Sequence, residues 1–374
     1  MRAWFCVFCF VFGVLPASAA EEFAASFRLR GGYDSNPLLT PNGKGSALAA
    51  WEAAAVYGRD NGEWVTGATG EAALTRYRER DFEPIQNYRL RLRLANKNQN
   101  DISFDATTTL VHFSNYDTKS DFVNQRVHVQ WMGGALRPFV AGDLRLASLN
   151  EANILLGNFL PEPMRYLRGT ITPGIAYVKD KVELGAQIAL SRTRYEAEPD
   201  LFGFHRNNDR VQPGVFAKFN AENFSASGAV SFLRVHSGEE FFTDVEALLF
   251  ELSVAARWQG WSGEISASRA AEDTTFPVSP VTINTTVQAK LGYDIAPKTN
   301  AGVFLRSLER KYWDTPLFSR TEIAGVEFTR GILEDISLAG QLGFAKATLF
   351  TGDKADGVIA SLSLTTRFAA PPKK

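Results

Sequence analysis

The nine residues Tyr88–Asn96, YRLRLRLAN, place apolar and basic side chains at strictly alternating positions. One parity carries tyrosine and leucine, and the other carries Arg89, Arg91 and Arg93. A period of two is that of a β-strand, whose successive side chains point to opposite faces. A helix, with 3.6 residues per turn, would distribute the three arginines around its circumference. The stretch therefore predicts a strand with one apolar face and one basic face.

The same alternation recurs along the chain and predicts about 18 strands, with 16 as the lower bound. The expected spans are 24–33, 46–58, 63–78, 87–96, 101–114, 122–131, 135–148, 165–178, 181–195, 209–220, 223–235, 244–258, 261–271, 282–294, 300–311, 319–329, 336–347 and 357–368. In the span 282–294, Ile283 shares the apolar parity of Val287 and Leu291. The span 319–329 is the least regular, because Ile323 lies on the parity opposite to that of Val326.

The connections between these spans alternate in length. Short links such as RDNG, GG and KD follow every second strand, and the remaining links are mostly longer, as in EAEPDLFGFHRNN. Membrane β-barrels have this arrangement, with short periplasmic turns and longer external loops joining an even number of antiparallel strands. The pattern predicts an all-β fold, a transmembrane antiparallel up-and-down β-barrel. A soluble all-β protein is the alternative, but it has no reason to sort its loops by length.

Aromatic residues next to the short turns give a second argument for a membrane barrel. Such barrels carry aromatic girdles on their outward face at the membrane interfaces. All the candidates have the apolar parity of their strands. The predicted girdle comprises Tyr57, Trp64, Trp131, Tyr177, Phe219, Phe224, Trp258, Trp261, Tyr293 and Phe328.

The first 20 residues have the features of a secretory signal peptide. Arg2 precedes an apolar run, and an A-x-A site follows at Ala17–Ala19. We therefore expect residues 1–20 to be removed, residues 21–368 to form the barrel, and residues 369–374 to form a short tail. Both cysteines, Cys6 and Cys9, lie inside the signal, so the mature chain has no thiol for a disulfide, a metal site or a nucleophile.

Composition and motifs narrow the function classes. The net charge of −1 does not suggest a nucleic-acid partner. The sequence has no Gly-x-Ser-x-Gly elbow, metal-spaced histidine pair or phosphate-binding loop, and we expect no catalytic residue, metal or cofactor. A loose group of His205, His236 and nearby carboxylates is the only alternative that points to catalysis.

The stretch GGYDSNP, residues 31–37, ends the first predicted strand. Asp34 and Asn36 favour a turn, because their side chains bond the backbone two positions on, and Pro37 ends strand pairing. The other interpretation is that their oxygens bind a cation or a sugar. The Tyr-Asp-Ser-Asn-Pro start resembles that of the β-barrel porin-2 family of bacterial outer-membrane proteins, and a similar start occurs in the barrels of surface-lipoprotein assembly modifiers. The first resemblance implies a membrane barrel associated with exopolysaccharide production, although such barrels commonly end at an aromatic residue and here Phe368 is followed by AAPPKK.

The polar parity of the strands is expected to face the lumen. The predicted pore-lining residues are Arg28, Arg30, Arg89, Arg91, Arg93, Arg126, His128, Arg145, Arg168, Glu71 and Asp105, with Glu52 and Asp143 as further acids. These side chains could form cross-strand ion pairs that stiffen the wall. They could instead form a constriction that attracts anions.

Two functions are consistent with these features. One is an outer-membrane pore of a Gram-negative bacterium for small hydrophilic solutes, with anions or saccharides as candidates. The other is a non-conducting component that supports export or anchoring of a surface polysaccharide. The expected partners are outer-membrane lipid, lipopolysaccharide and the barrel-assembly machinery, with polysaccharide as a further candidate. The sequence does not assign an oligomeric state.

Overall fold

The computed structural model describes residues 20–41, 43–79, 83–96, 101–115, 118–151 and 163–370. The expected signal peptide, except for Ala20, lies outside the described residues, as do the last four residues of the expected tail. Among the described residues there is no helix with the length and hydropathy needed to cross a membrane.

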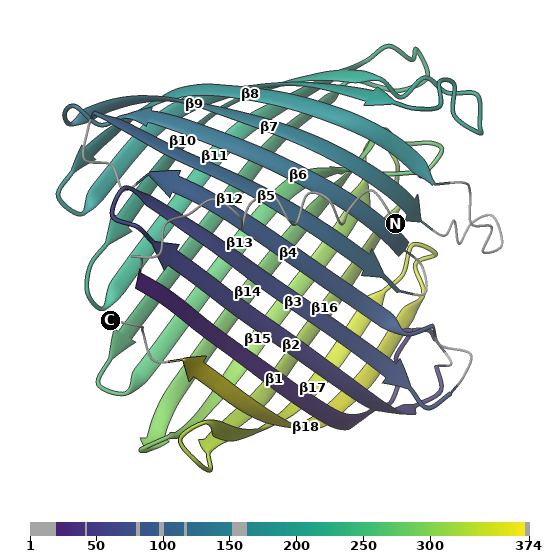
Figure 1. Ribbon diagram of the computed structural model, residues 1–374. Helices are drawn as coiled ribbons and strands as arrows, with labels where there is room; N and C mark the ends of the chain where they lie inside the picture. Colours follow the sequence, from purple (N-terminus) through teal and green to yellow (C-terminus); the bar gives the residue numbers. More distant parts are fainter. Residues whose placement is uncertain are drawn as a thin grey trace, which may run out of the picture.

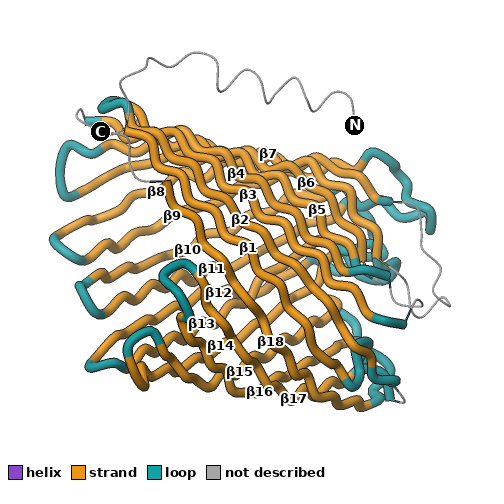
Figure 2. The backbone as a smooth tube through the Cα atoms, turned by 60° about the horizontal axis from the view of Figure 1, so that its bottom comes forward, coloured by secondary structure: helices purple, strands orange, loops and turns teal. Residues whose placement is uncertain are grey.

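The chain forms a closed barrel of 18 antiparallel strands (Figures 1 and 2). The strands are β1 (Ala20–Asp34), β2 (Ser46–Asp60), β3 (Trp64–Tyr77), β4 (Ile85–Asn96), β5 (Ile102–Ser114), β6 (Thr118–Trp131), β7 (Leu136–Glu151), β8 (Met164–Lys179), β9 (Val182–Tyr195), β10 (Asn208–Asn220), β11 (Phe224–Ser237), β12 (Val245–Trp258), β13 (Trp261–Asp273), β14 (Val281–Ala296), β15 (Thr299–Tyr312), β16 (Phe318–Gly331), β17 (Ile336–Thr348) and β18 (Lys354–Ala370). Each strand pairs with the next in sequence, and β1 closes the ring by pairing with β18. The predicted fold class and strand number are confirmed. Strand β16 contains Ile323 on the inner face, where its side chain lies close to Gly343.

The register separates an apolar outer face from a polar inner face throughout most of the barrel. Leu90 on β4 lies beside Gly70 of β3 and Leu110 of β5, and all three belong to the outer face. The predicted aromatic girdle residues share that outer face near the short turns, and Trp258 and Trp131 are among the most exposed. Arg89 and Arg91 lie on the other side of the same sheet.

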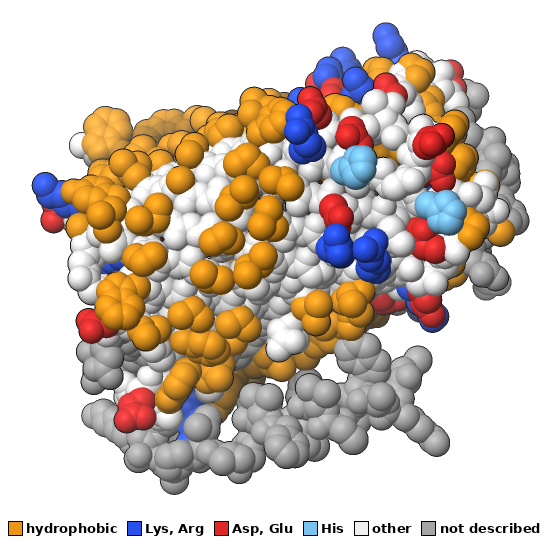
Figure 3. Space-filling view, turned by 90° about the horizontal axis from the view of Figure 1, so that it is seen from above, with side chains coloured by type: hydrophobic (Ala, Val, Ile, Leu, Met, Phe, Trp, Pro, Cys, Tyr) orange, Lys and Arg blue, Asp and Glu red, His pale blue; other side chains and the backbone are white. Residues whose placement is uncertain are grey.

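A belt of charged residues on the outer face begins where the apolar band ends. Figure 3 shows many of these charges gathered toward the end of the barrel that carries the longer loops, with apolar side chains scattered among white surface over the middle of the barrel. On β9 the apolar residues run from Val182 to Leu190, and Arg192 then pairs with Asp209 at 2.7 Å. Eight residue steps of about 3.3 Å, tilted by about 40°, cover roughly 20 Å, close to the ~25 Å apolar band of membrane barrels.

At its loop end the sheet opens between β12 and β13, and the β13–β14 hairpin, which stays paired with β15 as far as Thr282–Tyr312, turns into the lumen. Pairing between β12 and β13 stops at Phe250–Arg269, whereas β13 and β14 stay paired up to Asp273–Val281. Between this point and the loop, the side chains of the hairpin that share the parity of its lipid-facing residues pack against the inner side of β11 and β12. The buried cluster consists of Leu233, Val235, Val245, Ala247, Leu249, Val281 and Ile283.

The expected outward position of Ile283 is therefore wrong. Its parity matches that of Leu291, but the hairpin has turned inward at that height, and Ile283 is only 4% exposed. Burial against Leu233 and Leu249 replaces contact with lipid.

The GGYDSNP stretch joins the first loop to the last strand. Asp34 accepts a hydrogen bond from the Asn36 backbone N–H at 2.9 Å, as expected for an Asx turn. The Asn36 side-chain amide donates to the backbone oxygens of Thr40 and Asp356, at 2.8 and 2.9 Å. Val358 N–H donates to the Ser35 hydroxyl at 2.7 Å. These contacts tie the loop to the β1–β18 seam, so the side chains act within a turn.

Candidate functional site in the lumen

The structure places the predicted pore-lining residues on the inner face of β1 and β3–β8. Several of them stand directly opposite one another on adjacent strands, and residues linked in this way form a row across the sheet. These rows are Arg28–Glu52 on β1–β2, Glu71–Arg89 on β3–β4, Arg93–Thr107–Arg126–Asp143 on β4–β7, and Asp105–His128 on β5–β6. Arg30 lies two residues beyond Arg28, and Arg145 lies directly opposite Arg168 on β7–β8. The basic residues thus occupy β1 and β4–β8 on one side of the inner wall, which is called the basic sector below.

Four of these arginines form ion pairs with acids on neighbouring strands. The distances between nitrogen and carboxylate oxygen are 3.2 Å for Arg28–Glu52, 3.9 Å for Arg89–Glu71, 2.5 Å for Arg93–Asp105 and 4.0 Å for Arg126–Asp143. The arginine side chains in these pairs remain about half exposed. Exposed ion pairs of this kind contribute roughly 0–1 kcal/mol each to stability. Because the pairs are weak and the side chains are half exposed, the guanidinium groups remain accessible to solutes.

Three other arginines in the sector form no ion pair with any residue that the structure describes: Arg30, Arg91 and Arg145. Arg91 lies between Arg89 and Arg93, whose acids are engaged at the ends of the ladder. The Arg145 guanidinium lies 4.5 Å from the centre of the Phe122 ring. The sector therefore carries more positive than negative charge.

A buried ion-pair group fixes the inward hairpin to the basic wall. Asp273, at the end of β13, accepts hydrogen bonds at 2.5 Å from Arg168 on β8 and Arg210 on β10. The Asp273 and Arg210 side chains are only 3% and 6% exposed. Tyr195 on β9 adds a longer contact from its hydroxyl to Asp273, 3.5 Å. An isolated buried carboxylate would be strongly unfavourable, and the two guanidinium groups compensate its charge.

Two further residues hold the hairpin tip. Arg206, in the β9–β10 loop, is 4% exposed and donates to the backbone oxygens of Thr274, Phe276 and Ser279. Glu151, at the end of β7, accepts a hydrogen bond from the Thr274 hydroxyl at 2.7 Å. The apolar cluster and these polar contacts hold the hairpin inside the barrel, where it narrows the lumen on the side formed by β8–β14. Arg310 on β15 also reaches Glu151, at 3.9 Å, so β15 takes part in the constriction.

The sequence prediction included Arg168 but missed its partner Asp273 and the residues Arg210, Arg206 and Glu151. A signal for the inward hairpin was nevertheless present. On β12, Val245, Ala247 and Leu249 are apolar, although they belong to the inner parity. A strand that is apolar on both faces near its loop end requires a cover on its inner side, since water fills an open lumen.

The histidines do not form one site. His128 lies inside the barrel beside Phe139, with ring centres 5.4 Å apart. His112 and His236 lie on the outer face, where they contact Asp121 and Asp244 at 2.6 and 3.1 Å. His205 is in a loop beside Glu198. The described residues contain no group of three or more metal-ligating side chains arranged to hold a metal ion.

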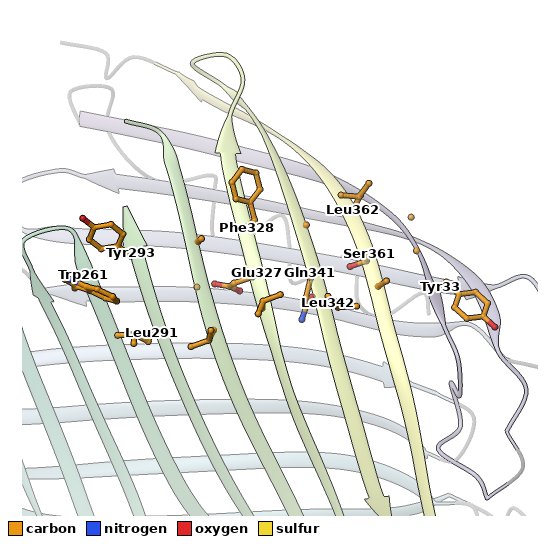
Figure 4. Close-up of a pocket in the computed structure, with 18 residues that line it drawn as sticks. Tyr33, Trp261, Leu291, Tyr293, Glu327, Phe328, Gln341, Leu342, Ser361 and Leu362 are labelled. Atoms are coloured by element: carbon orange, nitrogen blue, oxygen red, sulfur yellow. The ribbon is translucent and has the colours of Figure 1, made fainter. Parts of the chain in front are cut away.

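A groove of ≈ 1060 Å³ crosses the outer face from β13 to β1 (Figure 4). Figure 4 shows Trp261, Tyr293 and Phe328 among its lining residues, and the lining also includes the small residues Ala301 and Gly340. Because the exposed side chains belong to the lipid-facing parity, this groove is part of the membrane-facing surface and separate from the lumen.

No protein-family model matches the sequence, and no curated protein matches it. Solved outer-membrane proteins are similar in structure. The copper transporter OprC aligns over 95% of this chain and 81% of its own, with a TM-score of 0.50 and 10% identity. OpdO of Pseudomonas aeruginosa aligns over 94% of this chain and 98% of its own (TM-score 0.47, 10% identity), and OprD of the same organism over 93% and 96% (TM-score 0.44, 10% identity). At such low identity the likeness concerns the fold, which is that of outer-membrane β-barrels.

Proposed function

We propose that this chain is an outer-membrane pore of a Gram-negative bacterium that favours small anionic hydrophilic solutes. The observation that carries the proposal is the surplus of arginine on the inner wall formed by β1 and β4–β8. An 18-strand barrel is wide enough to hold water, and rings of basic side chains favour anions in pores.

The opposite wall carries charges of both signs. Strand β13 lies across the ring from β4, and its inner face carries Glu264. On the neighbouring strand, Glu251 also belongs to the inner face. Neither carboxylate forms an ion pair with a described residue. Lys290 is the register partner of Glu264 on the same inner face, so the surplus of positive charge lies with the arginine sector, and an anion would be drawn toward Arg91.

Planar-bilayer recording tests the proposal directly. We expect the purified mature protein to form channels whose reversal potential in a potassium chloride gradient shows preference for chloride. Preference should weaken as salt rises, because the Debye length falls from about 10 Å at 0.1 M to about 3 Å at 1 M. A folded protein that inserts but never conducts would contradict the pore.

The second candidate is a non-conducting component that supports export or anchoring of a surface polysaccharide. The inward hairpin, which is clamped by Arg206 and Asp273, is the observation that favours it, because a seated hairpin narrows the lumen. The same recordings separate the two candidates: inserted but silent barrels would favour the second.

A further inference from the structure

The inner wall carries the same four-residue arrangement twice. We call these sets the open quartet and the closed quartet. The open quartet is Arg91 on β4, Thr109 on β5, and Asn124 and Arg126 on β6; the closed quartet is Arg168 on β8, Thr193 on β9, and Asn208 and Arg210 on β10. In each set the first three residues are direct register partners, and the second arginine follows the asparagine by two positions.

The two quartets have the same orientation in the barrel. Strands β4, β6, β8 and β10 all run in one direction, because adjacent strands are antiparallel. Asn124 and Arg168 lie on one register row, joined through Arg145. The open quartet is therefore the closed quartet displaced by four strands around the wall.

The closed quartet shows what this arrangement binds. Arg168 donates from Nη2 to both oxygens of the Asp273 carboxylate, at 2.5 Å. Its Nε donates to the Thr193 hydroxyl at 2.9 Å, which fixes the plane of the guanidinium. Arg210 donates from Nε to the Asn208 side-chain oxygen at 2.9 Å and from Nη2 to Asp273. Threonine and asparagine orient the two arginines, and the arginines hold one carboxylate.

The open quartet has the same side chains, but no described carboxylate bridges its two arginines as Asp273 bridges those of the closed quartet. Arg91 forms no ion pair with a described residue, and Arg126 contacts Asp143 only at 4.0 Å. Both arginines are exposed to the lumen, whereas Arg210 in the closed quartet is buried. The difference follows from the inward hairpin, which supplies Asp273 to the closed quartet and does not reach β4.

We propose that Arg91, Thr109, Asn124 and Arg126 form a binding subsite for the carboxylate of a passing solute, such as an organic acid or a sugar acid. This inference rests on the proposed pore, because a solute must enter the lumen to reach it. Guanidinium groups recognise planar carboxylates through directed, charge-assisted hydrogen bonds. A subsite of this kind distinguishes a carboxylate from chloride by geometry, which the diffuse field of the basic sector does not.

Saturation-transfer NMR titrations of the detergent-purified protein with glucuronate, and with glucose as the uncharged counterpart, test binding without requiring conduction. We expect binding of glucuronate and much weaker binding of glucose. Arg91→Gln should weaken the binding of glucuronate about tenfold, which is the order expected for the loss of a charge-assisted hydrogen bond. Asn124→Ala and Thr109→Val should weaken it a few-fold without changing any charge. The matched control is Arg89→Gln, one pleat away on the same face of β4, which should change affinity by less than about twofold.

Reversal potentials of the same variants separate the subsite from the field. Arg89→Gln and Arg91→Gln should both shift selectivity toward cations, whereas Asn124→Ala should leave it unchanged. Equal loss of glucuronate binding in the two arginine variants, with no effect of Asn124→Ala or Thr109→Val, would overturn the subsite and leave only a diffuse field. Wild-type binding that follows the expected variant pattern in a barrel that never conducts would support the subsite and overturn the proposed pore. Retention of the unheated gel mobility shows that each variant is folded.

Discussion

Arg168 on β8 and Asp273 at the end of β13 form a 2.5 Å ion pair, although their strands are not neighbours in the barrel wall. The pair exists because the β13–β14 hairpin crosses part of the lumen, and Arg210 contacts the same carboxylate from β10. A buried carboxylate with two guanidinium partners holds the hairpin in one position. The size of the opening therefore depends on residues far apart in the sequence.

Removing that carboxylate should loosen the constriction. Asp273→Asn leaves Arg168 and Arg210 without their shared counter-charge, and breaking a buried pair typically costs about 3–5 kcal/mol. We expect larger and noisier single-channel conductance, because the hairpin spends more time away from the wall. The control is Asp209→Asn, which removes an exposed pair with Arg192 on the outer face. Identical conductance in the wild type and in Asp273→Asn would mean that the apolar cluster alone seats the hairpin.

The apolar cluster under the hairpin gives a second prediction. Leu233 is 2% exposed and contacts the hairpin from β11, so Leu233→Ala should leave a cavity beneath it. Such truncations cost about 2–5 kcal/mol in well-packed cores. In Leu233→Ala we expect the folded gel band to convert to the unfolded band at a lower temperature. If only the hairpin detaches and the barrel stays folded, the single-channel conductance should rise instead. Phe232→Ala, the neighbouring residue on the lipid face, is the control and should change conductance little.

The division between what the sequence predicts and what it does not has a physical cause. Alternation reports which side of a sheet a residue lies on, so strands such as 88–96 and the basic wall around Arg91 follow directly. It does not report whether a strand remains in the wall. Ile283 and Leu291 have the same parity, but one packs inside the barrel and the other faces lipid, because the hairpin turns inward between them. The Arg168–Asp273 pair could not be predicted either, since it depends on that turn.

The seam contacts predict a role for Asn36 in closing the barrel. Its side-chain amide joins the first loop to the Asp356 backbone oxygen next to the last strand pair. Asn36→Ala removes the part-buried hydrogen bonds to the Asp356 oxygen and from the Thr40 N–H, and the loss of such a bond costs about 0.5–1.5 kcal/mol. We expect a lower conversion temperature of the unheated gel band. Thr351→Ala, in the exposed β17–β18 turn, should have no such effect, and equal shifts in both variants would show that the contact is dispensable.

Surface labelling tests which end of the barrel faces outward. The exposed Glu240 lies in the β11–β12 loop, and the exposed Lys179 lies at the short β8–β9 turn. Cysteine at position 240 should react with an impermeant maleimide in intact cells, and cysteine at position 179 should react only after the outer membrane is opened. Labelling only at position 179 in intact cells would reverse the assigned orientation.

The arginine ladder of β4 gives the final prediction. Arg89, Arg91 and Arg93 stand on one face at intervals of about 6.6–6.8 Å, since each strand residue advances ~3.3–3.4 Å. Their charges repel one another, and among the residues that the structure describes only the two outer arginines contact acids, Glu71 and Asp105. Within a screening length of roughly 8–10 Å at physiological salt, the surplus should attract anions in the lumen. Replacing all three by glutamine should shift the reversal potential toward cations and leave insertion intact, because the leucines on the lipid face are unchanged. Unchanged selectivity in an open channel would show that the ladder serves the wall alone, and loss of insertion would show that these side chains are needed for folding.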